Sequence, residues 1–332
     1  MKRIGNLYDS VCSLDNLRLA DEKARRGKLK SYGVNKHDQN RETNIQLLHE
    51  LLITGQFKTS PYFVFKIREP KERTIYRLPY FPDRILHHAI MNITESIWVK
   101  ILTVDTFSCI KDRGIHFAAK RLKTDLKDVS GTRYCLKIDI KKYYPSIDHQ
   151  ILKEIIRRKI KDDRLLSLLD EIIDSAPGVP IGNYLSQYFA NLYLAYFDHY
   201  VKEQLKVKYY YRYADDMVFL DASKERLHII FDEVRIYLSS LKLTVKENWQ
   251  ISPVDSRGID FLGYKFFHGY MLMRKSIKQN MFRCIKKNAS DPARLMRSMA
   301  SYYGWMKHCN SNNLLNKVTY EIQSRICRTS GH

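Results

Sequence analysis

The sequence lacks the residue patterns of a metal–thiolate or disulfide scaffold. Its six cysteines form no C-x-x-C pair, and no histidines stand at the spacing of a zinc site. It also has no apolar run of the roughly 20 residues that span a membrane, and its opening MKRIGNLYDSVCSL contains no apolar signal segment. No internal repeat is visible. These absences argue against zinc modules, secreted disulfide proteins, membrane proteins and repeat proteins, and we expect a cytoplasmic protein with reduced thiols.

Acidic residues are scarce relative to basic ones. The 332 residues include 57 Lys and Arg but only 36 Asp and Glu, which gives a net charge of +21. Residues 265–332 alone hold 13 Lys and Arg against 2 acids. A phosphate-rich partner such as a nucleic acid is the simplest explanation for so one-sided a charge. A solvated basic surface is the alternative, although solubility does not require such clustering.

Apolar periodicity and turn residues predict mixed helices and strands, followed by an all-helical tail. We expect helices at about 44–55 with Gly55 as C-cap, from Asp83 as N-cap, at 149–174, from Leu185, at 224–240, and in the tail after Ser290 or Asp291. We expect strands in a hairpin around Pro70, at 134–140, in a pair over 207–221, and around 244–254 and 259–267. This order predicts a mixed α+β chain, long enough to enclose a large cleft.

One carboxylate stands in an otherwise apolar strand, YCLKIDI. Leu136, Ile138 and Ile140 fall on one face of this strand, and Lys137 and Asp139 fall on the other. A charged residue in such a strand is costly unless it is exposed or paired. We therefore expect Asp139 to face a cleft or solvent.

Two adjacent carboxylates, Asp215 and Asp216, lie in RYADDMVFLD, where one predicted strand turns into the next. Like charges this close repel each other unless cations offset them. Together with a third carboxylate from a neighbouring strand they would form a site of hard oxygen ligands, which suits Mg²⁺. Asp is also common in turns for backbone reasons, so an ordinary polar hairpin is the alternative from these two residues alone.

Six blocks of sequence, in order, resemble the reverse transcriptase family. The stretches LKIDIKKYYPSID, GVPIGNYLSQYFANLYL, YRYADDMVFL and GIDFLGYKF resemble its motifs A, B, C and E. Upstream, EPKERTIYRLPYFPDRILHHAI resembles the fingers, and SYYGWMKHCNSNNL resembles the thumb of retroelement enzymes. The resemblance covers nearly the whole chain from about residue 5.

The resemblance implies a right-hand polymerase of the α+β class. Its parts would be an N-terminal helical extension (1–55), fingers (56–134), a palm with an antiparallel sheet and helices (135–272) and a helical thumb (273–332). Part of the fingers would lie at about 150–178 within the palm range. No maturase, RNase H or endonuclease segment is expected beyond the thumb.

The resemblance also assigns the metal site. Asp139 and Asp215 would hold two Mg²⁺ ions with help from the Ile140 carbonyl, and Asp216 would be a nearby, less direct ligand. Two such ions clamp the attacking and leaving oxygens of a phosphoryl displacement. Tyr144 matches the bulky ring that excludes a 2′-hydroxyl and so selects dNTPs; ordinary aromatic packing is the alternative for it and its tyrosine neighbour.

Further residues match the nucleotide and nucleic-acid contacts of the family. Cations in the fingers would grip the triphosphate, and Gln187 would border the nucleotide and template. A loop lysine matches a proposed general acid for pyrophosphate, the FLGY stretch matches the primer grip, and thumb cations would follow the duplex phosphates. The residues are Lys71, Arg73 and Arg77 for the triphosphate, Lys246 for the acid, Phe261, Leu262 and Gly263 for the grip, and Arg274, Lys275, Lys278, Lys286 and Lys287 for the thumb.

The implied activity is RNA-directed DNA synthesis from a cognate structured RNA, with a DNA or RNA primer, dNTPs and a small accessory protein as further partners. The pair Ser186–Gln187 resembles the variant of motif B in diversity-generating retroelements, whereas most group II intron enzymes carry Gln-Gly there. A defence-associated enzyme that copies its own non-coding RNA is the alternative. An RNA-binding scaffold with secondary catalysis is an alternative of another class, which the intact carboxylates disfavour.

Overall fold

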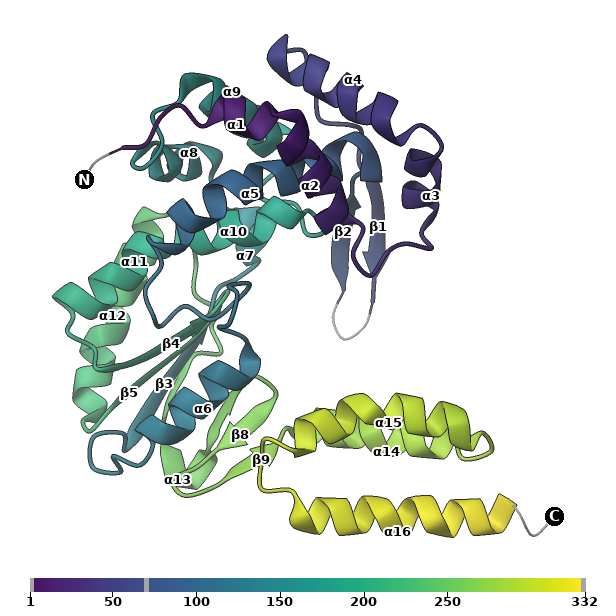
Figure 1. The fold of residues 1–332 in the computed structure, drawn as a ribbon. Coiled ribbons are helices and arrows are strands. Elements are labelled where there is room, and N and C mark those ends of the chain that lie inside the picture. The colour runs from purple at the N-terminus through teal and green to yellow at the C-terminus, as the bar shows by residue number, and fades with distance from the viewer. Residues whose placement is uncertain (1–2, 69–71, 330–332) are drawn as a thin grey trace. The chain divides into compact units, whose positions relative to one another are not determined.

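The computed structural model describes residues 3–68 and 72–329, which form two compact units (Figure 1). Unit 1 comprises Met1–Cys109, Ile140–Gln204 and Val234–Lys246. Unit 2 comprises Ile110–Asp139, Leu205–Glu233 and Glu247–His332. The chain therefore passes between the units several times, and one of these crossings falls directly after Asp139.

Unit 1 is mostly helical and carries one hairpin. Its helices are α1 (Tyr8–Cys12), α2 (Leu14–Ala24), α3 (Tyr32–Asp38), α4 (Arg41–Ile53), α5 (Ile85–Val99), α7 (Tyr143–Ser146), α8 (His149–Arg157), α9 (Asp163–Asp174), α10 (Tyr184–Tyr193) and α11 (Ala195–His199), with π-helical turns at Tyr80–Arg84 and Tyr200–Gln204. The hairpin pairs β1 (Phe63–Ile67) with β2 (Arg73–Arg77) in antiparallel register. The predicted hairpin is confirmed, and its tip at 69–71 lies outside the described residues.

Unit 2 contains two antiparallel sheets. The larger has the strand order β4-β5-β3-β6 and the smaller the order β7-β8-β9. The strands are β3 (Tyr134–Asp139), β4 (Tyr209–Tyr213), β5 (Asp216–Asp221), β6 (Gln250–Pro253), β7 (Ile259–Phe261), β8 (Tyr264–Phe266) and β9 (Met271–Met273). Helix α6 (Ile115–Asp125) lies against the larger sheet, and the hydroxyl of Tyr211 on β4 donates to its Asp125 (Figure 1).

The C-terminal part of unit 2 is helical, as predicted. Helices α14 (Lys275–Lys287), α15 (Pro292–Met306) and α16 (Asn312–Thr329) lie side by side (Figure 1). They share a core in which Met281, Ile285, Leu295, Met299 and Val318 are fully or almost fully buried. The remaining helices are the short α13 (Val254–Arg257) of unit 2 and α12 (Lys224–Ser240), at the predicted position. Helix α12 belongs to unit 2 up to Glu233 and to unit 1 from Val234.

The apolar alternation of 134–140 gives the predicted strand. Leu136 and Ile138 are buried, whereas Lys137 and Asp139 on the opposite face are only partly buried. Side chains of successive strand residues point to opposite faces, so one face of β3 packs and the other can carry charge. Cys135 lies on the same face as Lys137 and Asp139 but is buried.

Two expected features are wrong in detail. The helix expected at 149–174 is two helices, α8 and α9. Asp162 is the N-cap of the second helix, and its side chain accepts a hydrogen bond from Leu165 N (3.1 Å). Asp83 does not cap α5; it is buried and accepts from Ser60 N (3.0 Å) instead. The predicted cap at Asp291, which accepts from Arg294 N, is confirmed. The C-cap of α4 is Thr54, and the predicted Gly55 follows it in the left-handed region.

None of the helices in the described residues is both long enough and apolar enough to cross a membrane.

Candidate active site

Two of the three predicted carboxylates lie opposite each other on neighbouring strands. Asp139 is the last residue of β3, Asp216 is the first residue of β5, and the antiparallel register pairs them directly. Residues directly opposite in an antiparallel pair point to the same face of the sheet. The sheet of unit 2 therefore brings together two carboxylates that are 77 positions apart in the chain.

A lysine offsets part of this charge. Lys137 lies two residues before Asp139 on the same face of β3, and its Nζ is 3.4 Å from Asp216 Oδ1. The same ammonium group donates to the carbonyl of Asp260. Burial raises the pKa of Asp216 to about 6; Lys137 lowers this pKa, and Asp139 raises it. Lys137 was not predicted as a site residue, although its spacing from Asp139 places it on the same face.

The third carboxylate, Asp215, occupies the two-residue turn between β4 and β5. Its turn partner Ala214 has φ +55°, a conformation that residues other than glycine rarely adopt. The buried guanidinium of Arg212 donates to the Ala214 carbonyl at 3.2 Å and so supports this turn. Asp215 is partly exposed and immediately precedes Asp216.

These donors fit a divalent cation by their chemistry. They are carboxylates, the oxygen ligands that Mg²⁺ prefers, and a carboxyl whose ionised form burial disfavours gains from a nearby cation. Among residues 3–68 and 72–329, however, no three His, Cys, Asp or Glu side chains are close enough together to form a metal cluster. Ile140, the expected carbonyl ligand, is buried and forms a β-bridge with Val245. The assignment of two ions to these residues stays a prediction.

Unit 1 contains a pocket of about 180 Å³ that gathers two predicted nucleotide-binding residues. Tyr144 and Gln187 both line it, together with Arg84 and most of the segment 181–187. Gln187 is exposed and Ser186 is buried, so the two residues of the distinctive motif B pair face different surroundings. We refer to this space as the nucleotide-side pocket.

The loop before α10 fixes the shape of this pocket. Val179 N donates to the Tyr144 carbonyl at 2.9 Å, and Tyr76 N on β2 donates to the Ile181 carbonyl at 2.8 Å. A Cβ on Gly182, whose φ is +127°, would come within 2.4 Å of the Tyr76 carbonyl oxygen. The loop can therefore join Tyr144 to the hairpin strand only because glycine occupies this position.

Arg84 is a pocket residue that was not predicted. Burial lowers the pKa of its guanidinium, and no carboxylate among the described residues forms an ion pair with it. Arg84 is partly buried, and its Nε donates to the Ala24 carbonyl at 3.4 Å. A partly buried cation without an anionic partner favours a bound anion. The signal in the sequence was weak, because Arg84 stands at the start of a helix where a basic residue has no special meaning.

Other predicted residues lie elsewhere. Arg73 is exposed at the start of β2 and does not line the pocket, and Lys246 is partly buried just after Val245. Lys71 lies outside the described residues. Arg77 is exposed at the end of β2, with its guanidinium 4.8 Å from the ring centre of Phe63. The triphosphate and general-acid roles of these residues stay predictions.

The FLGY stretch forms a tight hairpin in unit 2. Leu262 and Gly263 join β7 to β8, and both have positive φ, as two-residue hairpin turns require. Phe261 is fully buried and Leu262 nearly so. Contacts of the FLGY residues themselves with a primer would therefore come mainly from the backbone, because Phe261, Leu262 and Tyr264 are buried. A Cβ on Gly263 would also collide with the Trp305 ring at 2.6 Å.

The predicted thumb cations lie on or just before α14. Arg274 precedes the helix, and its Nε is 2.5 Å from Asp260 Oδ1, so a carboxylate already balances its charge. The others, Lys275, Lys278, Lys286 and Lys287, are exposed, whereas Met281 and Ile285 of the same helix are buried. The exposed side of α14 is thus a basic surface suited to phosphates.

We expect replacement of these four lysines with Gln to weaken binding of every template–primer, whatever its sequence. Each lost phosphate contact should reduce the slope of log K against log salt by about 0.7 to 0.9, because fewer counterions are released on binding. Arg274→Gln should change the slope less. Fluorescence anisotropy over a salt series measures this, with Lys224→Gln on α12 as control. An unchanged slope in the quadruple variant would exclude α14 as the nucleic-acid track.

Comparison with known proteins identifies several relatives. The family model described as "Reverse transcriptase (RNA-dependent DNA polymerase)" matches residues 67–266. Protein YkfC of Escherichia coli (strain K12) is 25% identical over 320 residues and 82% of each chain. The group II intron-encoded protein LtrA of Lactococcus lactis subsp. cremoris is 28% identical over 182 residues, which are 51% of this chain but 30% of that protein.

A solved structure, apo telomerase from Candida tropicalis, matches with a TM-score of 0.49 and 12% identity over 81% of this chain. The matched region spans 62% of the telomerase chain. The α+β class and the antiparallel sheets expected from the sequence are confirmed.

Proposed function

The chain belongs to the reverse transcriptase family, and from that premise we propose that it makes complementary DNA from a cognate structured RNA within a diversity-generating retroelement. The main support for the proposed catalytic activity is the direct pairing of Asp139 with Asp216, next to the turn that contains Asp215. Together with the family match, this arrangement points to a polymerase active site, whereas two acidic residues on a hairpin alone would not. A DNA or RNA primer and dNTPs complete the proposed set of partners, in the cytoplasm.

The proposed reaction is attack of a primer 3′-hydroxyl on the α-phosphate of a dNTP, with pyrophosphate as the leaving group. Asp139, Asp215, Asp216 and the Ile140 carbonyl would hold two Mg²⁺ ions, which supply stabilisation of charge on the attacking and leaving oxygens. Lys137 would hold Asp216 in place through the 3.4 Å contact while that carboxyl binds metal. The desolvated guanidinium of Arg84 would bind an anionic phosphate group in the nucleotide-side pocket.

The same pocket would check the incoming nucleotide. Tyr144 and Gln187 line it, and the glycine-dependent loop 178–183 fixes the backbone around it. A pocket of fixed shape discriminates by the difference in transition-state free energy between correct and incorrect substrates. We propose that Tyr144 excludes a 2′-hydroxyl and that Gln187 contacts the nascent base pair.

A primer-extension assay with Mg²⁺, dNTPs and an RNA template tests the enzymatic proposal. Extension by the purified chain is the expected result. Tight RNA binding without extension, under conditions where a known reverse transcriptase extends the same primer, would instead support the alternative of an RNA-binding scaffold.

The retroelement role predicts a biased error spectrum. Because Ser186–Gln187 resembles the pair of diversification enzymes and Gln187 lines the nucleotide-side pocket, we expect misincorporation opposite template adenine to exceed that opposite the other bases at least tenfold. Such a ratio needs a change of only about 1.4 kcal/mol in discrimination. Sequencing cDNA made on a template of mixed composition measures it. A flat spectrum with strong preference for one structured RNA would favour the defence-associated alternative.

A further inference from the structure

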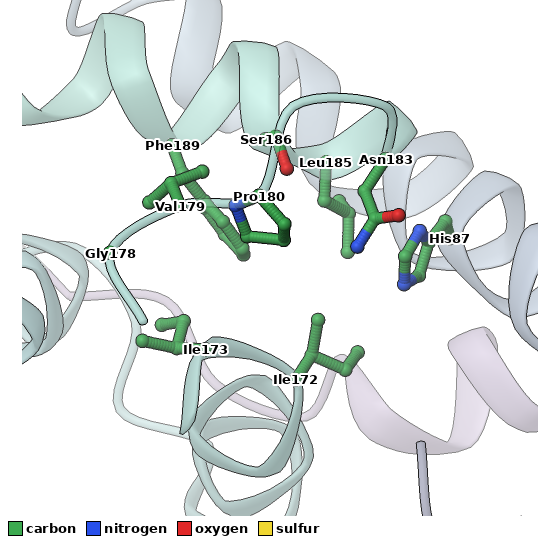
Figure 2. Close-up of a pocket in the computed structure, with 10 residues that line it drawn as sticks. All are labelled: His87, Ile172, Ile173, Gly178, Val179, Pro180, Asn183, Leu185, Ser186 and Phe189. Atoms are coloured by element: carbon green, nitrogen blue, oxygen red, sulfur yellow. The ribbon is translucent and has the colours of Figure 1, made fainter. Parts of the chain in front are cut away.

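A small cavity lies directly behind the nucleotide-side pocket. It has a volume of about 10 Å³ and is enclosed by α5, α9, α10 and the loop before α10. Figure 2 shows the side chains of His87, Asn183 and Ile172 directed into this space from three different elements. A cavity of this size is at the lower limit for one water molecule.

Asn183 and Ser186 line both spaces. They are almost fully buried, and they belong to the lining of the cavity as well as to that of the nucleotide-side pocket. The Asn183 amide also donates to the Tyr62 hydroxyl at 2.9 Å. At this point only Asn183 and Ser186 separate the cavity from the nucleotide-side pocket, and we call them the wall of the pocket. The side chains that pack against the wall from the cavity side therefore help to determine its position.

Two adjacent histidines of α5 support this wall. His87 lines the cavity behind Asn183 and Ser186. The ring of His88 stacks on Tyr184, with ring centroids 4.1 Å apart and planes inclined by 12°. Tyr184 in turn lines the nucleotide-side pocket. The pair thus contacts or backs three lining residues of the same segment, at positions 183, 184 and 186.

Both imidazoles are buried inside unit 1. Burial lowers the pKa of His87 to about 3 and that of His88 to about 4, so both rings are neutral near pH 7. Within the described part of the chain, neither Nε2 atom has a hydrogen-bond partner, although both are buried. A buried polar atom without a partner lowers stability, whereas an apolar ring would avoid that cost.

We infer that His87 and His88 are positioning residues that set how strictly the nucleotide-side pocket discriminates between nucleotides, through Asn183, Ser186 and Tyr184. This inference rests on the proposed function, because it takes the pocket to hold the nascent base pair. The cavity leaves the wall room to shift by a fraction of an ångström, which would admit a poorly fitting pair. A smaller cavity behind the wall should lower the ratio of incorrect to correct incorporation. Loss of the contacts that hold the wall should raise this ratio.

Three substitutions change the surroundings of this wall at residues that do not line the nucleotide-side pocket. Val179→Ile adds one methylene at the cavity and should lower the ratio of incorrect to correct incorporation at least threefold. His88→Leu removes the stack on Tyr184 and should raise that ratio at least threefold, mainly through KM for the correct dNTP. His87→Phe keeps a ring but removes the unpartnered nitrogen, and it should change the ratio by a similar factor.

Single-nucleotide insertion kinetics on a defined template measure KM and kcat separately for each variant. Leu169→Ala on α9 is the matched control, because Leu169 is fully buried but lines neither space, so it loosens the fold elsewhere. Wild-type ratios in all three variants, or an equal change in Leu169→Ala, would overturn the inference. If His88→Leu does not fold, His87→Phe and Val179→Ile together decide. Failure of the wild type to extend a primer would instead refute the proposed function.

Discussion

Replacing both Asp215 and Asp216 with Asn should reduce Mg²⁺-dependent DNA synthesis by roughly 10³-fold or more, since removal of groups that stabilise transition-state charge has effects of this order. The fold should survive the change. Asp215 lies in a partly exposed turn, and burial already disfavours the ionised form of Asp216, whose pKa is raised to about 6. Lys137 keeps its bond to the Asp260 carbonyl when Asp216 loses its charge.

Primer extension, thermal melting in metal-free buffer and RNA binding together test this expectation. Asp221→Asn is the matched control, because Asp221 ends the same strand β5 and is partly buried but has no predicted role in catalysis. It should retain activity. A collapse of the melting transition in the double variant would show that the two carboxylates support the fold, and activity within tenfold of wild type would remove them from the catalytic site.

The elements of this site could be predicted from the sequence, but their pairing could not. Alternation of apolar residues predicts a strand at 134–140 and a hairpin at 207–221, because side chains on a strand have a period of two. That period does not say which residues of two strands lie opposite each other. The direct pairing of Asp139 with Asp216, rather than with Asp215, is therefore visible only in the structure.

Some unpredicted residues depend on contacts that are distant in sequence, whereas Arg212 and Asp162 act on residues two and three positions away. Arg84 lines a pocket with residues a hundred positions further along, and a basic residue in isolation carries no sign of that. Arg212 is a buried cation among tyrosines, a combination that could have marked it as a support of the adjacent turn. Asp162 had a recognisable signal, since Asp often caps a helix, yet the continuous apolar pattern of 149–174 concealed the break.

Replacing Tyr144 with Val or Ala should increase incorporation of ribonucleotides by at least about a hundredfold relative to dNTPs, a change of roughly 3 kcal/mol in discrimination. Tyr144 lines the nucleotide-side pocket, and it is held there by its backbone, because its carbonyl accepts from Val179 N. Removing the ring therefore leaves the main chain in place and opens space where a 2′-hydroxyl would otherwise collide. Use of dNTPs should persist, since the carboxylates and Arg84 are unchanged.

The neighbouring tyrosine provides a matched control for this gate. Tyr143 is buried, and its hydroxyl donates to the Ala190 carbonyl, so its ring packs inside unit 1 and does not line the pocket. Tyr143→Phe should keep the wild-type preference for dNTPs. Incorporation of each dNTP and its NTP counterpart on one template, measured as kcat/KM, compares the three proteins. If the wild type already uses both sugars equally, Tyr144 is not a gate; if Tyr143→Phe relaxes selectivity as much as Tyr144→Val, the pocket discriminates through general packing and not through the Tyr144 ring.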